Sequence, residues 1–514
     1  MRLVCVLAVL AACGGDKDGQ DTSAGTATET SPTTTPGGTG GTATGTGGTA
    51  TGGTATGGTA TGGTATGGTA TGTATGGTAT GGTATGGTAT GGTATGGSTT
   101  DTGDTGSTVA NVAACVLGES GLTVDCSATL GEAGPVTLTL TAADAPTRTI
   151  TREEVAAEHS LTGWGLLAET TYTWELAGIE GEVTTGALPE GLADLEVEVT
   201  GEPFGLDAVL MYVSCGYFVM LDGQGRVIWA YETDVYDGLP DGMFWSQPDQ
   251  SVLALRDSTM APDISVFSEV HVSGEEVLRL EPDEDFTLLL THDVARWGPY
   301  TYLLGERPDD ISGFEVFEGH EYLGTYMLDE SFPDVDNLRI DHIHGLSVSA
   351  LGEVTLSVHG FDAVVAVDGD PASPTFLQKL WHASGAPDGI NDLPGPTYVP
   401  RGEEGFLKQH NAGLYDGLLW LYDNLGTETS RVVVYSLDDE RGRLELEHSW
   451  AMDRVCRNQG GALPVEDGAL ATCANQNLVW LFPADSEEPA WTISATCGAG
   501  FLNGSTRAYP VTIE

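Results

Sequence analysis

The chain has 514 residues and carries 73 acidic against 19 basic side chains, which gives a formal net charge of −54 at pH 7. This charge excludes nucleic acid as a partner, because binding to a phosphate backbone needs a basic surface. An anionic small molecule can bind only in a pocket that is locally positive. The length allows several domains, and the composition is typical of a well-solvated exterior.

The N-terminal segment has the layout of an export signal. An apolar run from Leu3 to Leu10 follows a basic residue and is too short to cross a bilayer. It ends in Leu-Ala-Ala-Cys, which resembles a bacterial lipobox with cleavage before Cys13 and lipidation of its thiol. We therefore expect residues 1–12 to be a lipoprotein signal peptide, with a plain signal peptide as the alternative. Gly14 resembles the outer-membrane-sorted kind, so we expect an exported protein that meets the membrane only through the lipid on Cys13.

Residues 13–107 are dominated by a Gly-Gly-Thr-Ala-Thr repeat. A tract with almost no apolar side chains cannot offset the entropy that ordering its backbone would cost. We predict a disordered linker that serves as a stalk.

Residues 108–194 change in character. Alternating runs at 137–141 and 171–176 lie between turn residues, as in a small β-sandwich. The segments 166–172 and 184–189 resemble the last strands of a fibronectin type III module. We predict a fibronectin III or immunoglobulin-like β-sandwich that acts as a spacer or contact domain.

Residues 195–514 contain a loose internal repeat. An apolar strand, a polar turn and a second strand that often ends in an aromatic residue recur in six copies, at 217–231, 265–280, 314–327, 363–381, 431–450 and 477–493. Their spacing of roughly 40 to 70 residues fits a four-stranded blade with variable loops. The chain is thus predicted to be all-β, with a six-bladed β-propeller here. Five or seven blades, or a sandwich or barrel with chance similarity, are the alternatives.

Six cysteines lie beyond the signal segment, and an even number in an exported chain suggests disulfides. Cys115 and Cys126 share the small domain and are expected to pair. The other four allow three connectivities, of which we favour Cys456–Cys473; the remaining two are Cys215 and Cys497.

Four histidines fall where an inner strand or its feeding loop should begin: His292, His344, His359 and His410. Inner strands of a propeller converge on the central channel, so separate blades can bring these imidazoles together. A lone histidine there is more often structural, but four at comparable positions favour a functional site.

Two stretches connect these histidines to a known family. The sequences DHIHGLSVSALGEVTLSVHGFDAVVAVD (341–368) and FLKQHNAGLYDGLLWLYDNLGTETSRVVVYSLD (406–438) resemble the bacterial arylsulfotransferases, or aryl-sulfate sulfotransferases. The Asp-x-x-His, the Gln-His and the Asp-Asn followed by Ser-Arg agree in order and spacing. The resemblance implies a six-bladed propeller behind a small β-domain, and sulfuryl transfer between phenols without a soluble nucleotide donor.

The resemblance also implies roles for the histidines. It makes His410 the nucleophile that carries the sulfuryl group, and His344 the acid and base toward the phenols, with Asp341 as a candidate orienting group. His292 would stabilise charge. His359 stands where the family has an arginine, a departure that replaces a permanent bidentate cation with a titratable group.

Two further residues are predicted to bind substrate, Lys408 and Asn411. Lys408 alternates with His410, so on a strand both side chains would face the same side and the lysine would partly replace the arginine. A solvated surface charge is the alternative for Lys408. Arg431 is interpreted as structural, paired with Asp423.

The predicted function is therefore transfer of a sulfuryl group from a phenolic sulfate donor to a phenol acceptor through a sulfohistidine, with no cofactor. One alternative is a non-catalytic propeller that binds a ligand or partner. Another is a metal-binding propeller, because His342 and the four histidines above could together supply ligands.

Overall fold

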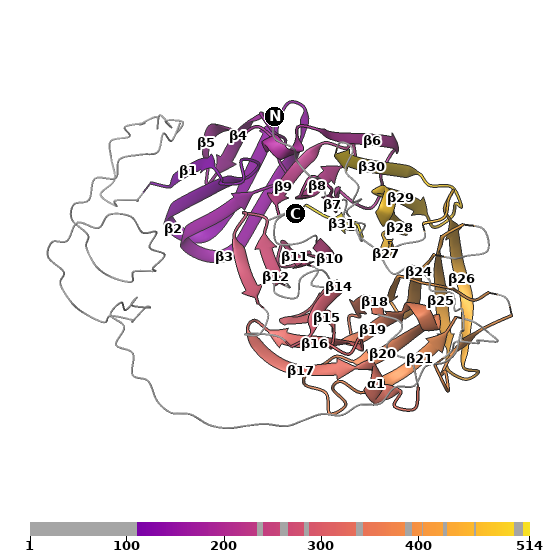
Figure 1. Cartoon of the computed structure of the whole chain (residues 1–514). Helices are drawn as coiled ribbons and strands as arrows, with labels where there is room; N and C mark the ends of the chain where they lie inside the picture. Colours follow the sequence, from indigo (N-terminus) through magenta and orange to yellow (C-terminus); the bar gives the residue numbers. More distant parts are fainter. Residues whose placement is uncertain are drawn as a thin grey trace, which may run out of the picture. The chain divides into compact units, whose positions relative to one another are not determined.

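The computed structural model describes residues 110–233, 240–256, 266–281, 287–335, 343–385, 393–402, 404–424, 429–456, 459–497 and 507–513 (Figure 1). The predicted signal peptide and stalk lie outside these residues, as do Asp341 and His342. The described part is almost entirely β-structure, and its one α-helix is α1, Leu328–Ser331. The all-β prediction is confirmed. No helix among the described residues has the length and apolarity that crossing a membrane requires.

The small N-terminal domain is a five-stranded sheet. It contains β1 (Val112–Leu117), β2 (Val124–Ala142), β3 (Ala145–Gly163), β4 (Thr171–Leu176) and β5 (Ile179–Thr184). Strand β2 pairs with β1, β3 and β4, and the β2–β3 ladder shifts register between Thr129 and Gly134. The predicted sandwich is therefore one continuous sheet in which bulges let two long strands change direction around a single core. The predicted Cys115–Cys126 disulfide joins β1 to β2.

Six further sheets have a ladder of four antiparallel strands each. The first contains β7 (Ala208–Val213), β8 (Tyr217–Asp222) and β9 (Val227–Glu232), with the C-terminal strand β31 (Tyr509–Val511) beside β7. The second contains β10 (Pro240–Ser246), β11 (Ser251–Arg256), β12 (Val266–His271) and β13 (Glu276–Leu280). The third contains β14 (Leu289–Trp297), β15 (Tyr300–Glu306), β16 (Ser312–Glu318) and β17 (Glu321–Met327).

The remaining three sheets continue in chain order. The fourth contains β18 (Ile343–Val348), β19 (Glu353–Val358), β20 (Ala363–Asp368) and β21 (Lys379–Ser384). The fifth contains β23 (Asn411–Tyr415), β24 (Leu418–Asp423), β25 (Arg431–Asp438) and β26 (Arg443–Ala451), with β22 (Val399–Pro400) beside β26. The sixth contains β27 (Gly461–Val465), β28 (Gly468–Cys473), β29 (Leu478–Pro483) and β30 (Trp491–Cys497), with β6 (Leu195–Gly201) beside β30.

The first strands of successive sheets meet one another. Strand β14 contacts β10 and β18, β23 contacts β18 and β27, and β31 contacts β10. Strand β30 also contacts β7, and the Cys215–Cys497 disulfide links the first and sixth sheets. The sheets therefore follow one another around a common centre, an arrangement compatible with the predicted six-bladed propeller (Figure 1). The predicted Cys456–Cys473 disulfide is also present.

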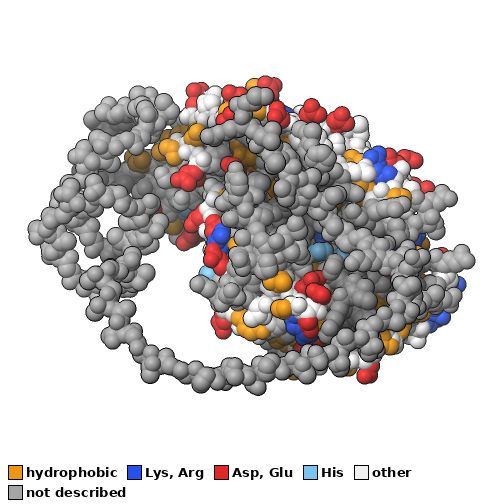
Figure 2. All heavy atoms as spheres, in the orientation of Figure 1, with side chains coloured by type: hydrophobic (Ala, Val, Ile, Leu, Met, Phe, Trp, Pro, Cys, Tyr) orange, Lys and Arg blue, Asp and Glu red, His pale blue; other side chains and the backbone are white. Residues whose placement is uncertain are grey.

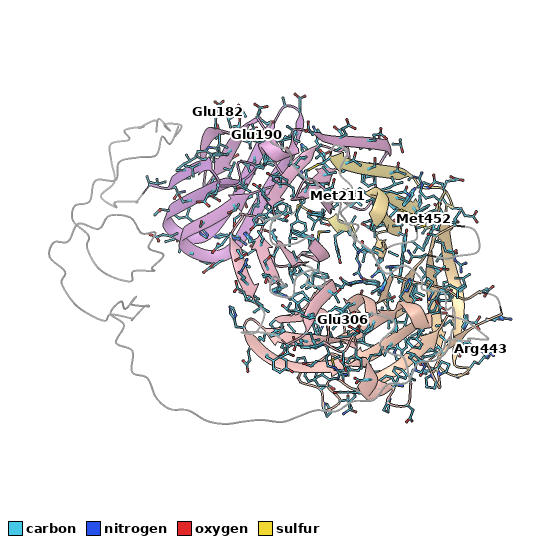
Figure 3. The ribbon with its side chains drawn as sticks, in the orientation of Figure 1. Glu182, Glu190, Met211, Glu306, Arg443 and Met452 are labelled. Carbon is cyan, nitrogen blue, oxygen red and sulfur yellow. A yellow bond between two sulfur atoms is a disulfide. The ribbon has the colours of Figure 1, made fainter. Side chains whose placement is uncertain are left out.

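The burial of the strands explains the repeat in the sequence. Strand β8 is buried along its whole length because both of its faces pack against neighbouring sheets, so it appears as a continuous apolar run. Each of the six sequence copies covers the third and fourth strands of one sheet, as 217–231 covers β8 and β9. Glu182 and Glu190 lie at the surface while Met211 is buried (Figure 3). Acidic groups also outnumber basic ones on the face seen in Figure 2.

Candidate functional site

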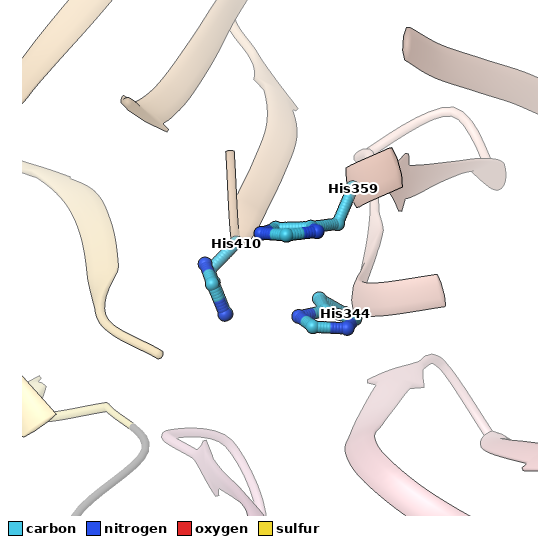
Figure 4. Close-up of side chains that lie close together, drawn as sticks. All are labelled: His344, His359 and His410. Carbon is cyan, nitrogen blue, oxygen red and sulfur yellow. The ribbon is translucent and has the colours of Figure 1, made fainter. Parts of the chain in front are cut away.

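Four histidines from three sheets meet at the centre, and we call them the histidine cluster: His292, His344, His359 and His410. His344 lies in the middle, with its ring centroid 4.4 Å from that of His359, 4.5 Å from His410 and 4.8 Å from His292. The rings of His344 and His359 are stacked, and His410 meets both rings edge-on (Figure 4). The structure thus brings together all four histidines that the sequence singled out.

His410 precedes β23 and is held by Asn424. Its Nδ1 lies 2.8 Å from Asn424 Oδ1, while the Asn424 amide nitrogen donates to the carbonyl oxygens of Cys456 (2.6 Å) and Gln459 (3.0 Å). Because the amide nitrogen is engaged as a donor, Oδ1 must accept, and His410 Nδ1 carries the hydrogen. The lone pair of the imidazole is therefore on Nε2.

Burial keeps this imidazole uncharged. His410 is 5% exposed. The pKa of His410 is lowered to about 3, chiefly by desolvation and to a smaller extent by the nearby imidazoles of His359 and His292, against the opposing effect of the hydrogen bond to Asn424. His410 is accordingly a neutral base with a fixed tautomer at every physiological pH.

Gln409 positions the turn that carries His359. The Gln409 side chain is fully buried, and its Nε2 donates to the carbonyl oxygens of Val358 (3.2 Å) and Ala363 (2.7 Å). These two residues flank the 3-10 turn His359–Phe361. Gln409 therefore helps to fix the distance between His359 and its own neighbour His410. In the Gln-His pair, the glutamine has a structural role and the histidine lines the cavity.

A bulge in β14 carries His292 and Asp293. The β14–β15 ladder shifts register between Leu290 and Val294, and His292 has a φ of 61°, a conformation that non-glycine residues rarely adopt. The Asp293 carboxylate accepts from the backbone N–H of Leu346 at 2.6 Å and of Val294 at 3.0 Å. The bulge thus turns two polar side chains toward the centre.

Asp293 forms an ion pair with Arg507, a residue of the C-terminal segment just before β31. Both side chains are almost fully buried. The pKa of Asp293 is raised to about 6, because burial outweighs the lowering effect of Arg507. Burial lowers the pKa of Arg507, but the Asp293 carboxylate and neighbouring tyrosines outweigh it, so the pKa of Arg507 is raised. Arg507 is therefore a permanent cation paired with a buried carboxylate.

A small cavity joins these groups. Its lining is formed by His292, His344, His410, Gln459, Gly460 and Arg507. A Cβ atom at Gly345 would lie 2.8 Å from Arg507 Nη2, so the guanidinium reaches this position only over a glycine. The cavity, with a volume of about 10 Å³, is lined by the uncharged His410 ring and by the Arg507 guanidinium, so its charge favours an anionic group.

The structure separates Lys408 and Asn411 from this lining. Residues 406–410 are not in a strand, and Lys408 has a φ of 55° with its backbone N–H donating to Asp362 Oδ1, so the alternation argument for Lys408 is wrong. Asn411 is buried and accepts from the N–H of Ala462 at 2.9 Å, which joins the fifth sheet to the sixth. The predicted Arg431–Asp423 pair is confirmed, at 2.8 Å.

Sequence reasoning missed Arg507 and the role of Asn424. Arg507 belongs to neither matched stretch, and only the pairing of β31 with β7 brings the end of the chain to the centre. A signal existed, because Arg507 is one of only 19 basic residues in the chain and it precedes the last apolar strand. His359 contacts His344 and His410 but does not line the cavity.

The fold and the site define a propeller-like all-β protein with a histidine-lined centre. No family model and no curated protein matches the chain. Similar solved structures include a candidate 6-phosphogluconolactonase from Bacteroides fragilis, with 13% identity, 74% of this chain and 96% of that chain covered, and a TM-score of 0.32. Apo AztD from Citrobacter koseri matches with 11% identity, 74% and 98% coverage, and a TM-score of 0.26. At these values the matches carry no inference about function.

Proposed function

We propose that this protein transfers a sulfuryl group from an aryl sulfate to a phenolic acceptor through a covalent intermediate on His410. The observation that carries the proposal is the neutral His410 imidazole, whose Nδ1–H is engaged by Asn424 and whose ring lines a cavity together with Arg507. The resemblance of the two stretches around His344 and His410 to arylsulfotransferases supports the same chemistry.

The first half-reaction forms a nitrogen–sulfur bond. The His410 Nε2 lone pair attacks sulfur while the bond from sulfur to the aryl oxygen breaks and its electron pair leaves with the phenolate. His344, whose ring centroid is 4.5 Å from that of His410, gives a proton to this oxygen. The products are a free phenol and a sulfuryl group on His410.

The second half-reaction reverses these steps with another phenol. The acceptor oxygen forms a bond to sulfur, the nitrogen–sulfur pair returns to His410, and the acceptor proton passes to His344. Both enzyme groups regain their starting states. No other reactant is consumed, so the electron and proton balance closes without a cofactor.

Arg507 is the group proposed to hold the sulfate oxygens. In a chain with a net charge of −54, an anionic donor needs a local cation, and Arg507 lines the cavity beside His410. A guanidinium can stabilise negative charge that spreads over the equatorial oxygens in the transition state. On this proposal Arg507 supplies the cation that is absent at position 359.

We further propose that the protein acts as an exported lipoprotein. The support is the Leu-Ala-Ala-Cys sequence that ends at Cys13 and the Gly/Thr/Ala-rich stretch that follows it. Phenols and aryl sulfates would then meet the enzyme outside the cytoplasm.

The test is release of phenol from a chromogenic aryl sulfate with a second phenol as acceptor. We expect His410→Gln to lose at least about 1,000-fold in rate. His382→Gln is the matched control, because His382 is also a buried imidazole but lies in β21 outside the cluster.

A donor supplied without acceptor should leave a sulfuryl adduct on the peptide that contains His410, detectable by mass spectrometry. Transfer that persists in His410→Gln would overturn the assignment. Absence of turnover and of adduct in the parent protein across several aryl sulfates would leave a non-catalytic binding propeller.

A further inference from the structure

Three members of the histidine cluster offer nitrogen atoms to one point. One ring nitrogen each from His344, His359 and His410 lies within 4.8 Å of the other two. Around a tetrahedral zinc ion, ligand nitrogens are about 3.4 Å apart, since each bond is 2.0–2.1 Å long. A movement of about 1 Å by each side chain would bring the three nitrogens to bonding distance.

The ligands in this set define the kind of metal. The three side chains offer imidazole nitrogens, and the group contains no carboxylate. Nitrogen donors favour zinc, copper and nickel, whereas calcium and magnesium prefer oxygen. Three protein ligands also leave a fourth position for solvent or an anion.

Hydrogen bonds around His410 and His359 hold these side chains in place, as is usual for metal ligands. His410 donates its other ring N–H to Asn424 Oδ1, which directs the Nε2 lone pair away from Asn424, as metal-ligating histidines usually do. Gln409 fixes both ends of the turn that carries His359.

We propose that His344, His359 and His410 bind a divalent transition-metal cation, represented by zinc, and that this cation and the sulfuryl group compete for His410. The competing step rests on the proposed function, because the coordinate bond uses the Nε2 lone pair that would attack sulfur. His359 is the residue that distinguishes the two uses, since it belongs to the metal set but does not line the cavity. Zinc is thereby an inhibitor of the transferase rather than its cofactor.

The experiment is calorimetric titration of the full chain with zinc chloride after chelation and dialysis, with magnesium chloride as a second titrant. We expect saturable binding of one zinc per chain and no binding of magnesium. His359→Gln and His359→Arg should each weaken zinc binding at least about 100-fold, because neither an amide nor a guanidinium offers a nitrogen lone pair as the third ligand. His448→Gln is the matched control, as His448 is exposed on β26, and it should bind zinc as the parent does.

Thermal melts of every variant check the fold, and zinc should raise the melting temperature of the parent and the His448 variant alone. Absence of saturable binding in the parent, or unchanged binding in both His359 variants, would overturn the metal site. These outcomes do not depend on activity.

The competition is tested separately by measuring transfer against zinc concentration. The parent should lose activity with the midpoint seen in calorimetry, and transfer by His359→Arg, whatever its zinc-free rate, should be insensitive to the same concentrations. Transfer by zinc-saturated parent protein at its full rate would overturn the competition. Zinc binding by a parent that shows no transfer would refute the proposed function and leave the metal site standing.

Discussion

The two sides of the cavity are built on different physical principles. On the side of the fifth sheet, a neutral hydrogen bond from His410 to Asn424 sets the tautomer of an uncharged base. On the side of the third sheet, the buried Asp293–Arg507 ion pair sets the place of a permanent charge. Burying a neutral hydrogen-bonded pair costs little free energy, whereas removing one partner of a buried ion pair strongly destabilises the fold. The difference indicates that the cation side is the more sensitive to loss of one partner.

The largest expected effect comes from removing the cation. Arg507→Met leaves the Asp293 carboxylate buried without its counter-charge, which should lower the free energy of unfolding by about 3 to 5 kcal/mol. It should also reduce sulfuryl transfer about 100- to 1,000-fold, because the charge beside the cavity is lost. Denaturant unfolding and the phenol-release assay measure the two effects.

The double variant Asp293→Asn with Arg507→Met separates stability from activity. Removing both charges should restore most of the unfolding free energy while transfer stays low. Recovery of transfer in the double variant would show that Arg507 acts on the fold and not on the donor.

The two short disulfides give a smaller effect and a direct comparison between domains. Cys456–Cys473 closes a separation of 17 residues and Cys115–Cys126 one of 11. Replacing either pair with alanine should cost about 3 kcal/mol in its own domain. Only the Cys456/Cys473 variant should also lose activity, because the Cys456 carbonyl holds Asn424. Equal activity of both variants would show that this carbonyl stays in place without the disulfide.

The sequence predicted the side of the site whose residues lie in the repeated sheets and in the two matched stretches. The histidines could be found because each lies in or next to an inner strand of a sheet, and Asp423 and Arg431 could be paired because they face each other on β24 and β25. Arg507 could not be found in this way, since its place depends on how β31 closes the first sheet. Lys408 was misplaced because period-two reasoning assumes a strand, and its left-handed backbone conformation interrupts one.

A third prediction concerns Asn424. Replacing it with alanine removes the acceptor that fixes the tautomer of His410, and such supporting partners typically change activity by about 10- to 100-fold. Asn424→Asp keeps an acceptor and adds a charge that favours imidazolium, so its activity should fall as the pH decreases toward neutrality. Rate–pH profiles of the two variants distinguish these effects; identical profiles would show that Asn424 only fills space.

The most gradual expected effect is on stability as a function of pH. The pKa of His410 is lowered to about 3 in the folded protein, while an unfolded histidine titrates near 6.5. Between these values the unfolded chain binds a proton that the folded chain refuses, so stability is present above about pH 6.5 and is lost as the pH falls toward 3. The slope for His410 is on the order of 1 kcal/mol per pH unit.

The contribution of Asp293 to the pH dependence of stability has the opposite sign, because its raised pKa lets the folded state take up a proton before the unfolded chain does. The contribution of His382, whose pKa is lowered to about 4, has the same sign as that of His410. The contributions of Asp293 and His382 are common to the parent and His410→Gln, so they cancel in the difference between the two unfolding free energies. Their unfolding free energies, measured by urea titration from pH 7.5 to pH 4, should run parallel above pH 7 and separate below pH 6, with the parent falling faster. Parallel curves over the whole range would mean that His410 is protonated in the folded protein as readily as in the unfolded chain. The fold would then not hold His410 uncharged, and the contrast between an uncharged side and a charged side of the cavity would fail.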